Sequence, residues 1–411
     1  MLLSASNGST PQRRDSRRFP AAASRVAALS LAGLLAACSS ADVVSAPAVA
    51  SGTSAITVAA ALPSLAIDPL LTPASAPIPL TFATYEGSGE VVHPDMVVFP
   101  EQWNARKYWM ALTPYPNSST DTENPSLFAG AGADALDVPE GLANPLARTR
   151  IGYLSDPDLV FNPATNELWL YYREVESVKK SHKADHVRLM RSGDGIHWSA
   201  SRELFSAKAK YVVSPTIART TEGDWRLWEV DAGAKGCSAD VTRIMERRST
   251  DGVAWGAPRE TRFTQAGFMP WHLDVQWVPS RHAYFALVAA YKRGRDCGST
   301  DLFLATSLDG VTWTTYSSPI LEHGAVPQFA SSVYRSTFAF DETGENITIW
   351  FSGSAPAPAL SHGGPERLRW SAAVATLNAD ALLARVSTLR TTKIKNPTPA
   401  NKSIVDLNDA P

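Results

Sequence analysis

The stretch Ser192-Gly-Asp194-Gly195-Ile-His-Trp198 decides the fold, because the same spacing of Ser, Asp-Gly and Trp returns twice further along the chain. The later copies begin at Ser249 and Ser307, and the intervals between the Asp residues are 57 and 58 residues. An Asp-Gly pair between strand-like runs is a strong β-hairpin signal, because glycine accepts the positive φ of a tight turn. A fixed period of this length indicates units that bury their faces against neighbouring units.

Aligning these turns reveals five units, each with an apolar opening strand, a polar turn and an aromatic second strand. In the second unit the two strands are Asp156-Pro-Asp-Leu-Val-Phe161 and Leu168-Trp-Leu-Tyr-Tyr172. The five opening strands are His93–Phe99, Asp156–Phe161, Ser214–Ala218, His272–Trp277 and Arg335–Phe340. Five sheets of about four strands each predict an all-β chain folded as a five-bladed β-propeller.

The N-terminal segment is typical of an export signal. Several arginines precede the short apolar run Ala27–Ala37, which is too short to span a bilayer as a permanent helix. The run ends Leu35-Ala-Ala-Cys38, which resembles the lipobox of bacterial lipoproteins. That resemblance implies a signal peptide over residues 1–38, lipid on Cys38 and anchoring in the cell envelope, with Ser39 favouring the outer membrane or cell surface.

Composition divides the remainder of the chain. Residues 39–77 are rich in Ala, Ser, Pro and Thr and predict a flexible tether, residues 78–390 hold the propeller, and residues 391–411 form a polar tail. The formal net charge is −2, so we expect no nucleic-acid partner, and we expect a monomer. Cys237 and Cys297 occupy matching loops of neighbouring units, 60 residues apart, and in an oxidising compartment they predict a disulfide.

Alternation along the opening strands predicts two polar rings around the central axis. The upper ring, at the mouth of the channel, consists of His93, Asp156, Ser214, His272 and Arg335. The lower ring, two residues deeper, consists of Asp95, Asp158, Thr216, Asp274 and Thr337. Buried carboxylates and imidazoles cost free energy unless they are paired, ligated or used. The rings are therefore either a ligand or catalytic site or a hydrated channel whose polar groups satisfy one another.

The x-Pro openings and aromatic second strands, from about residue 85 to about residue 385, resemble glycoside hydrolase family 43 and its five-bladed relatives of the arabinanase, levansucrase and invertase type. The resemblance implies an Asp base opening the first blade, a second Asp opening the second and a Glu acid opening the third. Asp156 matches the second position, whereas His93 and Ser214 occupy the other two. The chain therefore resembles a divergent member of this group.

The leading hypothesis is a surface-anchored glycosidase that acts on an extracellular poly- or oligosaccharide at the channel mouth. Glycoside hydrolysis needs a proton donor and a carboxylate that activates water or attacks carbon. The candidate catalytic residues are Asp156, Asp95, Asp274, Glu123 and Glu229. The candidate substrate-binding residues are His93, Asn124, Arg173, Ser214, Trp228, Trp271, His272 and Arg335. The tryptophans are candidates because an aromatic face suits the apolar face of a sugar.

Two alternatives stay open. The same mouth could belong to a non-catalytic glycan-binding lipoprotein. It could also hold a metal, since His93, Asp95, His272 and Asp274 would suit a cation. No pair among these four residues has a local metal-ligand spacing such as His-x-x-x-His, so we expect no metal or cofactor beyond a structural cation in the channel. A sialidase is disfavoured, because the Asp-Gly turns resemble its Asp-box but the sequence has room for five blades rather than six.

Overall fold

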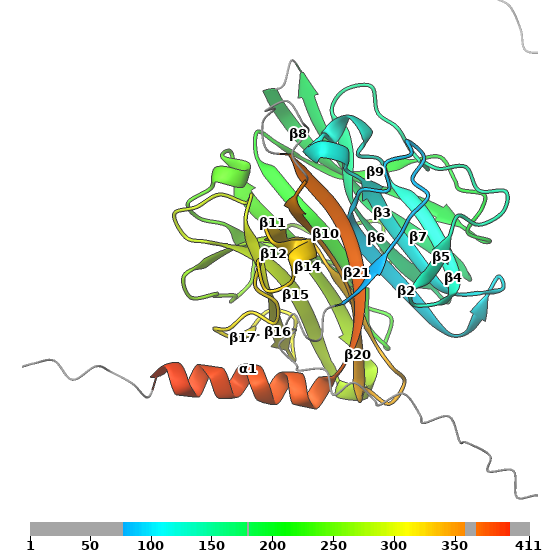
Figure 1. The fold of residues 1–411 in the computed structure, drawn as a ribbon. Coiled ribbons are helices and arrows are strands. Elements are labelled where there is room, and N and C mark those ends of the chain that lie inside the picture. The colour runs from blue at the N-terminus through cyan, green and yellow to red at the C-terminus, as the bar shows by residue number, and fades with distance from the viewer. Residues whose placement is uncertain (1–76, 179–180, 358–366, 395–411) are drawn as a thin grey trace, which may run out of the picture. The chain divides into compact units, whose positions relative to one another are not determined.

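The computed structural model describes residues 77–178, 181–357 and 367–394. They form five antiparallel sheets arranged as a five-bladed β-propeller (Figure 1), which confirms the predicted fold class. In the described part of the chain, no helix is long and apolar enough to cross a membrane. The predicted signal peptide with Cys38, the tether apart from Pro77, and the tail beyond Ile394 lie outside the described residues.

The first four blades are continuous in sequence, with strands added from the axis outward. Blade one contains β2 (Val91–Trp103), β3 (Arg106–Pro114), β4 (Ser126–Gly132) and β5 (Ala135–Asp137). Blade two contains β6 (Tyr153–Asn162), β7 (Glu167–Val178), β8 (Ser181–Ser192) and β9 (Arg202–Lys208). Blade three contains β10 (Tyr211–Arg219), β11 (Trp225–Gly233), β12 (Arg243–Ser249) and β13 (Arg259–Glu260). Blade four contains β14 (Phe268–Val278), β15 (Ala283–Lys292), β16 (Thr300–Ser307) and β17 (Thr314–Thr315).

Blade five is closed by the N-terminal end of the propeller. It contains β18 (Ser332–Val333), β19 (Thr337–Phe340), β20 (Asn346–Pro356) and β21 (Leu368–Asn378), and β1 (Ile78–Leu80) adds to its outer edge. Ile78 pairs with Val374 and Leu80 with Ala372 in an antiparallel register. The last sheet is therefore completed from the other end of the chain, which the repeat pattern did not predict.

Helices are few among the described residues, and all but one are single 3-10 turns. The 3-10 turns are η2 (Pro116–Ser118), η3 (Thr120–Thr122), η4 (Gly236–Ser238), η5 (Pro279–Arg281) and η6 (Pro327–Phe329). One α-helix, α1 (Ala379–Ile394), follows blade five and buries Leu382 and Val386 against its core. The predicted boundary between propeller and tail at residue 390 falls inside this helix, so the polar tail begins as regular structure.

Each of the three Asp-Gly turns packs against the preceding blade. In the first, the hydroxyl of Ser192 accepts a hydrogen bond from Gly195 N at 2.8 Å, and Asp194 accepts one from Ile196 N at 2.8 Å. Gly195 has a φ of 78°, and a Cβ atom there would lie 2.2 Å from the Trp109 ring of the preceding blade. Only glycine fits this close approach, so the turns pack the blades together at the end opposite the upper ring.

The predicted disulfide is present. Cys237 and Cys297 are bonded, with their Cα atoms 5.0 Å apart. Cys237 lies in η4 between β11 and β12, and Cys297 lies between β15 and β16, so the bond links blades three and four. The link lies at the same end of the propeller as the upper ring, because the opening strands of blades three and four begin there.

Candidate functional site

In three of the opening strands, a strained bulge turns the side chain of one residue toward the axis. β2, β6 and β10 each shift register at an x-Pro pair, at His93, Asp156 and Ser214. The φ angles of these three residues are 55°, 49° and 50°, in the left-handed region that non-glycine residues rarely adopt. Bulges re-aim side chains, and such strain persists mainly where a function requires it.

The upper ring converges on Asp156. Its Oδ1 atom lies 3.0 Å from His272 Nδ1 and 3.6 Å from His93 Nε2, and accepts a hydrogen bond from the Ser214 hydroxyl at 3.1 Å. The Ser214 hydroxyl also lies 2.6 Å from His272 Nδ1. All four side chains are buried. The structure therefore brings four of the five predicted upper-ring residues into mutual contact.

A fifth group reaches the cluster from a loop. Glu123, between η3 and β4, places Oε1 3.2 Å from His93 Nδ1, and the Thr113 hydroxyl lies 3.1 Å from the same nitrogen. Glu123 is buried, and its backbone carbonyl accepts a hydrogen bond from Leu154 N on blade two. Glu123 and Asp156 thus contact opposite nitrogens of the same imidazole ring.

Each imidazole has one nitrogen that makes no hydrogen bond to a described residue. Their Nδ1 atoms are held by Glu123, Ser214 and Asp156, whereas Nε2 of His93 and of His272 has no hydrogen-bond partner among the described residues and is shielded from solvent. Ligand atoms of His93, Asp156 and His272 all lie within 4.8 Å of one another. Two imidazoles and a carboxylate, each oriented by an outer oxygen, are a donor set typical of divalent transition metals.

The pKa shifts of His93, His272 and Asp156 favour the protonation states that bind a metal. Burial lowers the pKa of His93 and of His272, although the nearby Asp156 raises it in part, so both rings are neutral at neutral pH. Burial opposes ionisation of Asp156, but the two imidazoles and Arg173 outweigh it and hold the pKa of this carboxyl well below its usual range. Neutral imidazoles and an ionised carboxylate are the forms that bind a metal.

Glu123 behaves differently from Asp156. Burial raises the pKa of Glu123, and the hydrogen bond with His93 offsets only part of that rise. The cluster therefore combines a carboxylate that stays ionised with one that binds a proton more readily. Two carboxyls whose pKa values are driven apart are typical of sites that perform acid–base chemistry.

The lower ring gathers three carboxylates around one guanidinium. Ligand atoms of Asp95, Asp158 and Asp274 lie within 4.8 Å of one another. Arg335 Nη2 lies 3.1 Å from Asp158 Oδ1 and 3.6 Å from Asp95 Oδ1, and its Nη1 atom donates to the Pro157 carbonyl at 2.5 Å. The predicted role of Arg335 in substrate binding stays a prediction, but this guanidinium is already engaged inside the protein.

The lower ring also connects consecutive blades. Asp95 accepts a hydrogen bond from Leu159 N at 2.6 Å, and Asp158 accepts one from Ile217 N at 2.9 Å. Thr216 accepts a third from Val275 N at 3.0 Å. Each acceptor lies one blade before its donor, so these contacts join blades one to four beneath the upper ring. This arrangement explains the lower ring as a structural layer.

Three tyrosines that the sequence analysis did not single out surround the cluster. Tyr334 packs on both imidazoles, with ring centroids 4.3 Å from His272 and 5.4 Å from His93. Tyr115 and Tyr153 are partly exposed and close enough to Glu123 for that carboxyl to raise their pKa values, although burial contributes more. None of the three lies within the aligned opening segments such as Asp156–Phe161, so strand alignment could not reveal them.

The other predicted residues divide into two groups. Trp271 and Asn124 lie beside the cluster. Trp271 donates to the Tyr334 hydroxyl at 3.0 Å. Asn124, next to Glu123 in the chain, donates to the Tyr85 hydroxyl, which in turn donates to the carbonyl of the last residue of η3. Trp228 and Glu229 do not join it. Trp228 donates to the Gly310 carbonyl at 2.8 Å and packs on Tyr284 and Trp313.

Glu229 is buried away from the ring. Its Oε1 atom accepts hydrogen bonds from Arg247 Nε at 3.2 Å and Nη2 at 3.1 Å. Arg247 in turn lies over the Phe205 ring of blade two, at 4.1 Å from the ring centroid. Glu229 therefore takes part in packing between blades two and three, because its side chain faces the neighbouring blade rather than the axis.

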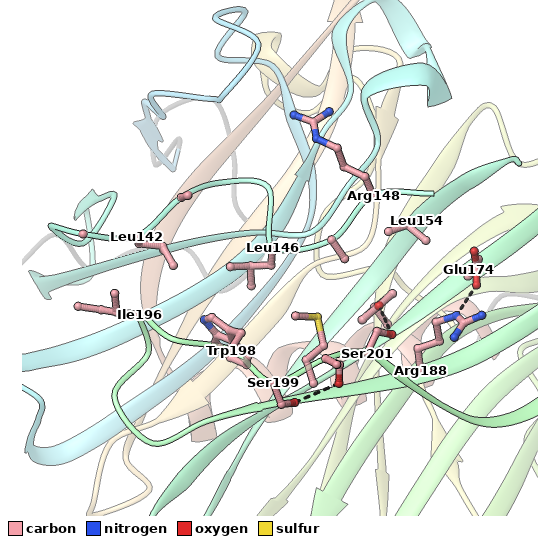
Figure 2. Close-up of a pocket in the computed structure, with 16 residues that line it drawn as sticks. Leu142, Leu146, Arg148, Leu154, Glu174, Arg188, Ile196, Trp198, Ser199 and Ser201 are labelled. Atoms are coloured by element: carbon pink, nitrogen blue, oxygen red, sulfur yellow. Dashed lines mark hydrogen bonds and ion pairs between the residues drawn. The ribbon is translucent and has the colours of Figure 1, made fainter. Parts of the chain in front are cut away.

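Cavities of the described structure also lie outside the upper cluster, one of them beside blade two and another at the lower ring. Figure 2 shows one of about 670 Å³, lined by Leu142, Leu146, Trp198 and the paired Glu174 and Arg188, between the segment 141–148 and blade two. The other, of about 830 Å³, reaches Asp95, Asp158 and Asp274 from the lower end of the channel. Neither is lined by His93, Asp156 or His272, so neither of these two cavities contains the His–Asp–His cluster.

The fold and site define a five-bladed propeller with a His–Asp–His cluster at its axis. No family model matches the chain. It is 28% identical over 314 residues to an A type blood N-acetyl-alpha-D-galactosamine deacetylase of Flavonifractor plautii, an alignment that covers 64% of this chain and 40% of that enzyme. The chain thus aligns with less than half the length of this relative.

Solved structures agree on the architecture. An N-acetylgalactosamine deacetylase from F. plautii, crystallised with blood group B trisaccharide, superposes with a TM-score of 0.68 at 23% identity, covering 76% of this chain and 97% of that one. A xylan beta-1,4-xylosidase from Bacillus halodurans gives a TM-score of 0.52 at 15% identity, covering 74% and 56%. A GH43_1 enzyme from Xanthomonas citri gives 0.51 at 11%, covering 77% and 95%. The resemblance to family 43 is confirmed for the fold.

Proposed function

We propose that this protein is a metal-dependent hydrolase that removes acetyl groups from N-acetylated sugars in a glycan. The observation that carries the proposal is the His93–Asp156–His272 cluster, in which two buried Nε2 atoms make no hydrogen bond to any described residue and lie beside an ionised carboxylate. The similarity to a curated deacetylase adds the substrate class. The metal-dependent alternative from the sequence is thus favoured, with Asp156 rather than Asp95 or Asp274 as the carboxylate.

The residues present fit a divalent cation. Glu123 and Thr113 contact His93 Nδ1, and Ser214 contacts His272 Nδ1, so outer oxygens orient both rings. A bound cation of this kind polarises a carbonyl oxygen and acidifies a water molecule. His93, Asp156 and His272 would hold it.

Glu123 is the residue suited to move the proton. Its raised pKa lets it accept a proton from the attacking water and later donate that proton to the departing nitrogen. In this reaction a C–O bond forms at the acetyl carbon, the amide C–N bond breaks, and acetate and an amino sugar are released. Asp156, whose pKa is held low, stays ionised throughout.

The tyrosines around the cluster are suited to hold the sugar. Tyr115 and Tyr153 are partly exposed next to Glu123, and a phenol offers both an apolar face and a hydrogen-bonding hydroxyl. Trp271 is tied to Tyr334, which packs on both imidazoles. Binding of a glycan at this end would therefore contact the same side chains that orient the metal ligands.

A glycosidase is the second candidate, because Asp156 and Glu123 lie on either side of His93 and could act as a carboxylate pair. The family-43 scheme, however, requires an Asp where this chain has His93 and a Glu where it has Ser214. His93 is instead a member of the His–Asp–His cluster, and the Ser214 hydroxyl contacts both Asp156 and His272. This arrangement favours amide hydrolysis over glycoside hydrolysis.

The test uses the mature chain with oligosaccharides that end in N-acetylgalactosamine or N-acetylglucosamine. Acetate, free amines and reducing ends are measured before and after dialysis against a chelator, and after adding back Zn²⁺ or Mn²⁺. Metal-dependent release of acetate and amine in equal amounts, without reducing ends, supports the proposal. New reducing ends would indicate the glycosidase, and saturable binding without either product would indicate the glycan-binding protein.

A matched pair of variants locates the activity. His272→Ala should lose acetate release and metal, whereas His197→Ala, which removes an exposed imidazole from an Asp-Gly turn, should retain both. Equal loss in the two variants would contradict a site at the upper ring.

We further propose that the protein acts as a monomer at the bacterial envelope, held by lipid on Cys38. The support is the basic segment, the short apolar run and the lipobox-like Leu35-Ala-Ala-Cys38, which lie outside the described residues. Cys38→Ser should move the protein from the membrane fraction to the soluble fraction, and unchanged fractionation would contradict the anchor.

A further inference from the structure

A chain of charged side chains of alternating sign runs outward from the cluster, through β7 to β8 of blade two. Asp156 Oδ2 lies 3.4 Å from Arg173 Nη1, and Asp185 Oδ2 accepts hydrogen bonds from Arg173 Nε at 3.1 Å and Nη2 at 2.9 Å. Asp185 Oδ1 lies 2.9 Å from His182 Nε2, and the His182 ring stacks on Tyr211 at 3.8 Å. The links between Asp156, Arg173 and Asp185 are all buried.

Asp185 is fixed more firmly than the arginine that it holds. Its Oδ2 atom also accepts a hydrogen bond from Val212 N on blade three at 2.7 Å. Three donors therefore converge on one oxygen, while His182 holds the other. Arg173 is 4% exposed and Asp185 is 2% exposed, so neither can exchange these partners for water without disturbing the blade.

Arg173 binds Asp185 more closely than it binds Asp156. Asp185 takes the Nε–Nη2 edge of the guanidinium, and only Nη1 remains to reach Asp156, at the long end of hydrogen-bond distance. An arginine that is free to turn pairs with a carboxylate through two short parallel bonds. Such a pair would occupy Asp156 Oδ2 and set a fixed cation against any metal bound at the same carboxylate.

We propose that Asp185 is a positioning residue, which holds Arg173 back from Asp156 and so keeps the Asp156 carboxylate available to a metal ion. This inference rests on the proposed metal site. It assigns to Asp185 an effect on metal affinity that acts through Arg173, although Asp185 itself contacts no residue of the cluster in the described structure.

A purely structural role makes a different prediction. If Asp185 served only to join blades two and three through Val212, its removal would affect metal binding whether or not Arg173 were present. Asp185→Asn tests the distinction, because asparagine has nearly the same shape and retains an oxygen that can accept the bond from Val212 N.

The experiment is a double-mutant cycle with metal affinity as the readout. Zn²⁺ dissociation constants are measured by calorimetric competition with a chelator for wild type, Asp185→Asn, Arg173→Gln and the double variant. We expect Asp185→Asn to weaken binding about 10- to 100-fold, the range for residues that orient metal ligands. Arg173→Gln should restore most of that loss in the double variant, because no arginine remains to compete.

Glu229→Gln is the matched control, since Glu229 is a buried carboxylate that receives the same Nε–Nη2 edge from Arg247 but lies outside the cluster. Its metal affinity should equal that of wild type. A loss in Asp185→Asn that persists in the double variant, or no loss at all, would overturn the proposal.

A crystal structure of Asp185→Asn separates this inference from the proposed function. If wild type binds no divalent metal, the proposed function fails, yet the position of Arg173 can still be read. We expect its guanidinium to turn and approach Asp156 through two nitrogens. A guanidinium that stays where it lies in wild type would overturn the positioning role regardless of metal binding.

Discussion

Asp156 Oδ1 lies 3.0 Å from Nδ1 of His272, although the two residues open blades two and four. The strained φ of 49° at Asp156 turns its carboxylate toward the axis, where side chains from non-adjacent blades can meet. His93 of blade one and Ser214 of blade three complete the contact set. The site thus belongs to four blades at once, and its geometry depends on closure of the whole propeller.

Asp156→Asn should abolish most of the activity without unfolding the protein. The amide cannot carry the charge that both imidazoles and Arg173 stabilise in the wild-type carboxylate. We expect the rate of acetate release to fall at least about 10- to 100-fold, the loss that follows even from changes to residues that only orient metal ligands, with the thermal transition preserved. Asp137→Asn, an exposed change on β5, serves as the control. Unaltered turnover in Asp156→Asn would remove this site from consideration.

Substitution of the buried Glu123 should affect the reaction rate, whereas substitution of the buried Glu229 should affect stability. Glu123→Gln removes the proton-transfer group beside His93 and should lower the rate about 100- to 10,000-fold, with little change in stability. Glu229→Gln breaks a buried pair with Arg247 and should cost on the order of 3 kcal/mol in the free energy of unfolding, with turnover retained. Urea melts and steady-state rates on both variants check this; the reverse pattern would restore Glu229 as the catalytic candidate.

The lower ring should make the protein less stable at alkaline pH. Burial and the neighbouring Asp274 raise the pKa of Asp95 to about 8, although Arg335 opposes this, whereas the unfolded carboxyl has a pKa of 3.8. Between these values the folded state binds more protons than the unfolded state, so the free energy of unfolding falls as pH rises.

Asp95→Asn removes this titration while keeping an oxygen that can accept the bond from Leu159 N. Urea melts at pH 5, 7 and 9 should show a smaller loss of stability in Asp95→Asn than in wild type. The exposed Asp137→Asn should keep the wild-type slope. Parallel slopes for all three proteins would refute a raised pKa at Asp95.

The bond between Cys237 and Cys297 should stabilise blades three and four against each other. Thiol titration of the unreduced propeller should find no free cysteine. The double change to serine should lower the free energy of unfolding by about 2 to 5 kcal/mol, because the bond restricts the unfolded chain. Urea melts should show this difference between wild type and the variant under oxidising conditions. Under reducing conditions the difference should vanish, because wild type then lacks the bond as well.

Sequence reasoning reached the fold because its signals are local and repeated. The Asp-Gly turns at Asp194, Asp251 and Asp309 need only a few adjacent residues to form, and their interval defines the blade. The matched positions of Cys237 and Cys297 followed from the same period. Alternation along the opening strands placed His93, Asp156 and His272 toward one axis. The sequence by itself therefore determined the blades and the residues that face the channel.

The tertiary structure decided which of those residues work together. Nothing in the sequence distinguishes Glu123, which a loop brings to His93, from Glu229, which Arg247 neutralises between blades. The closing strand β1 and the three tyrosines around the cluster likewise depend on contacts between distant segments. The physical reason is that a strand's alternation fixes the direction of a side chain, whereas its charge state and its partner depend on what the neighbouring blades place within a few ångströms of it.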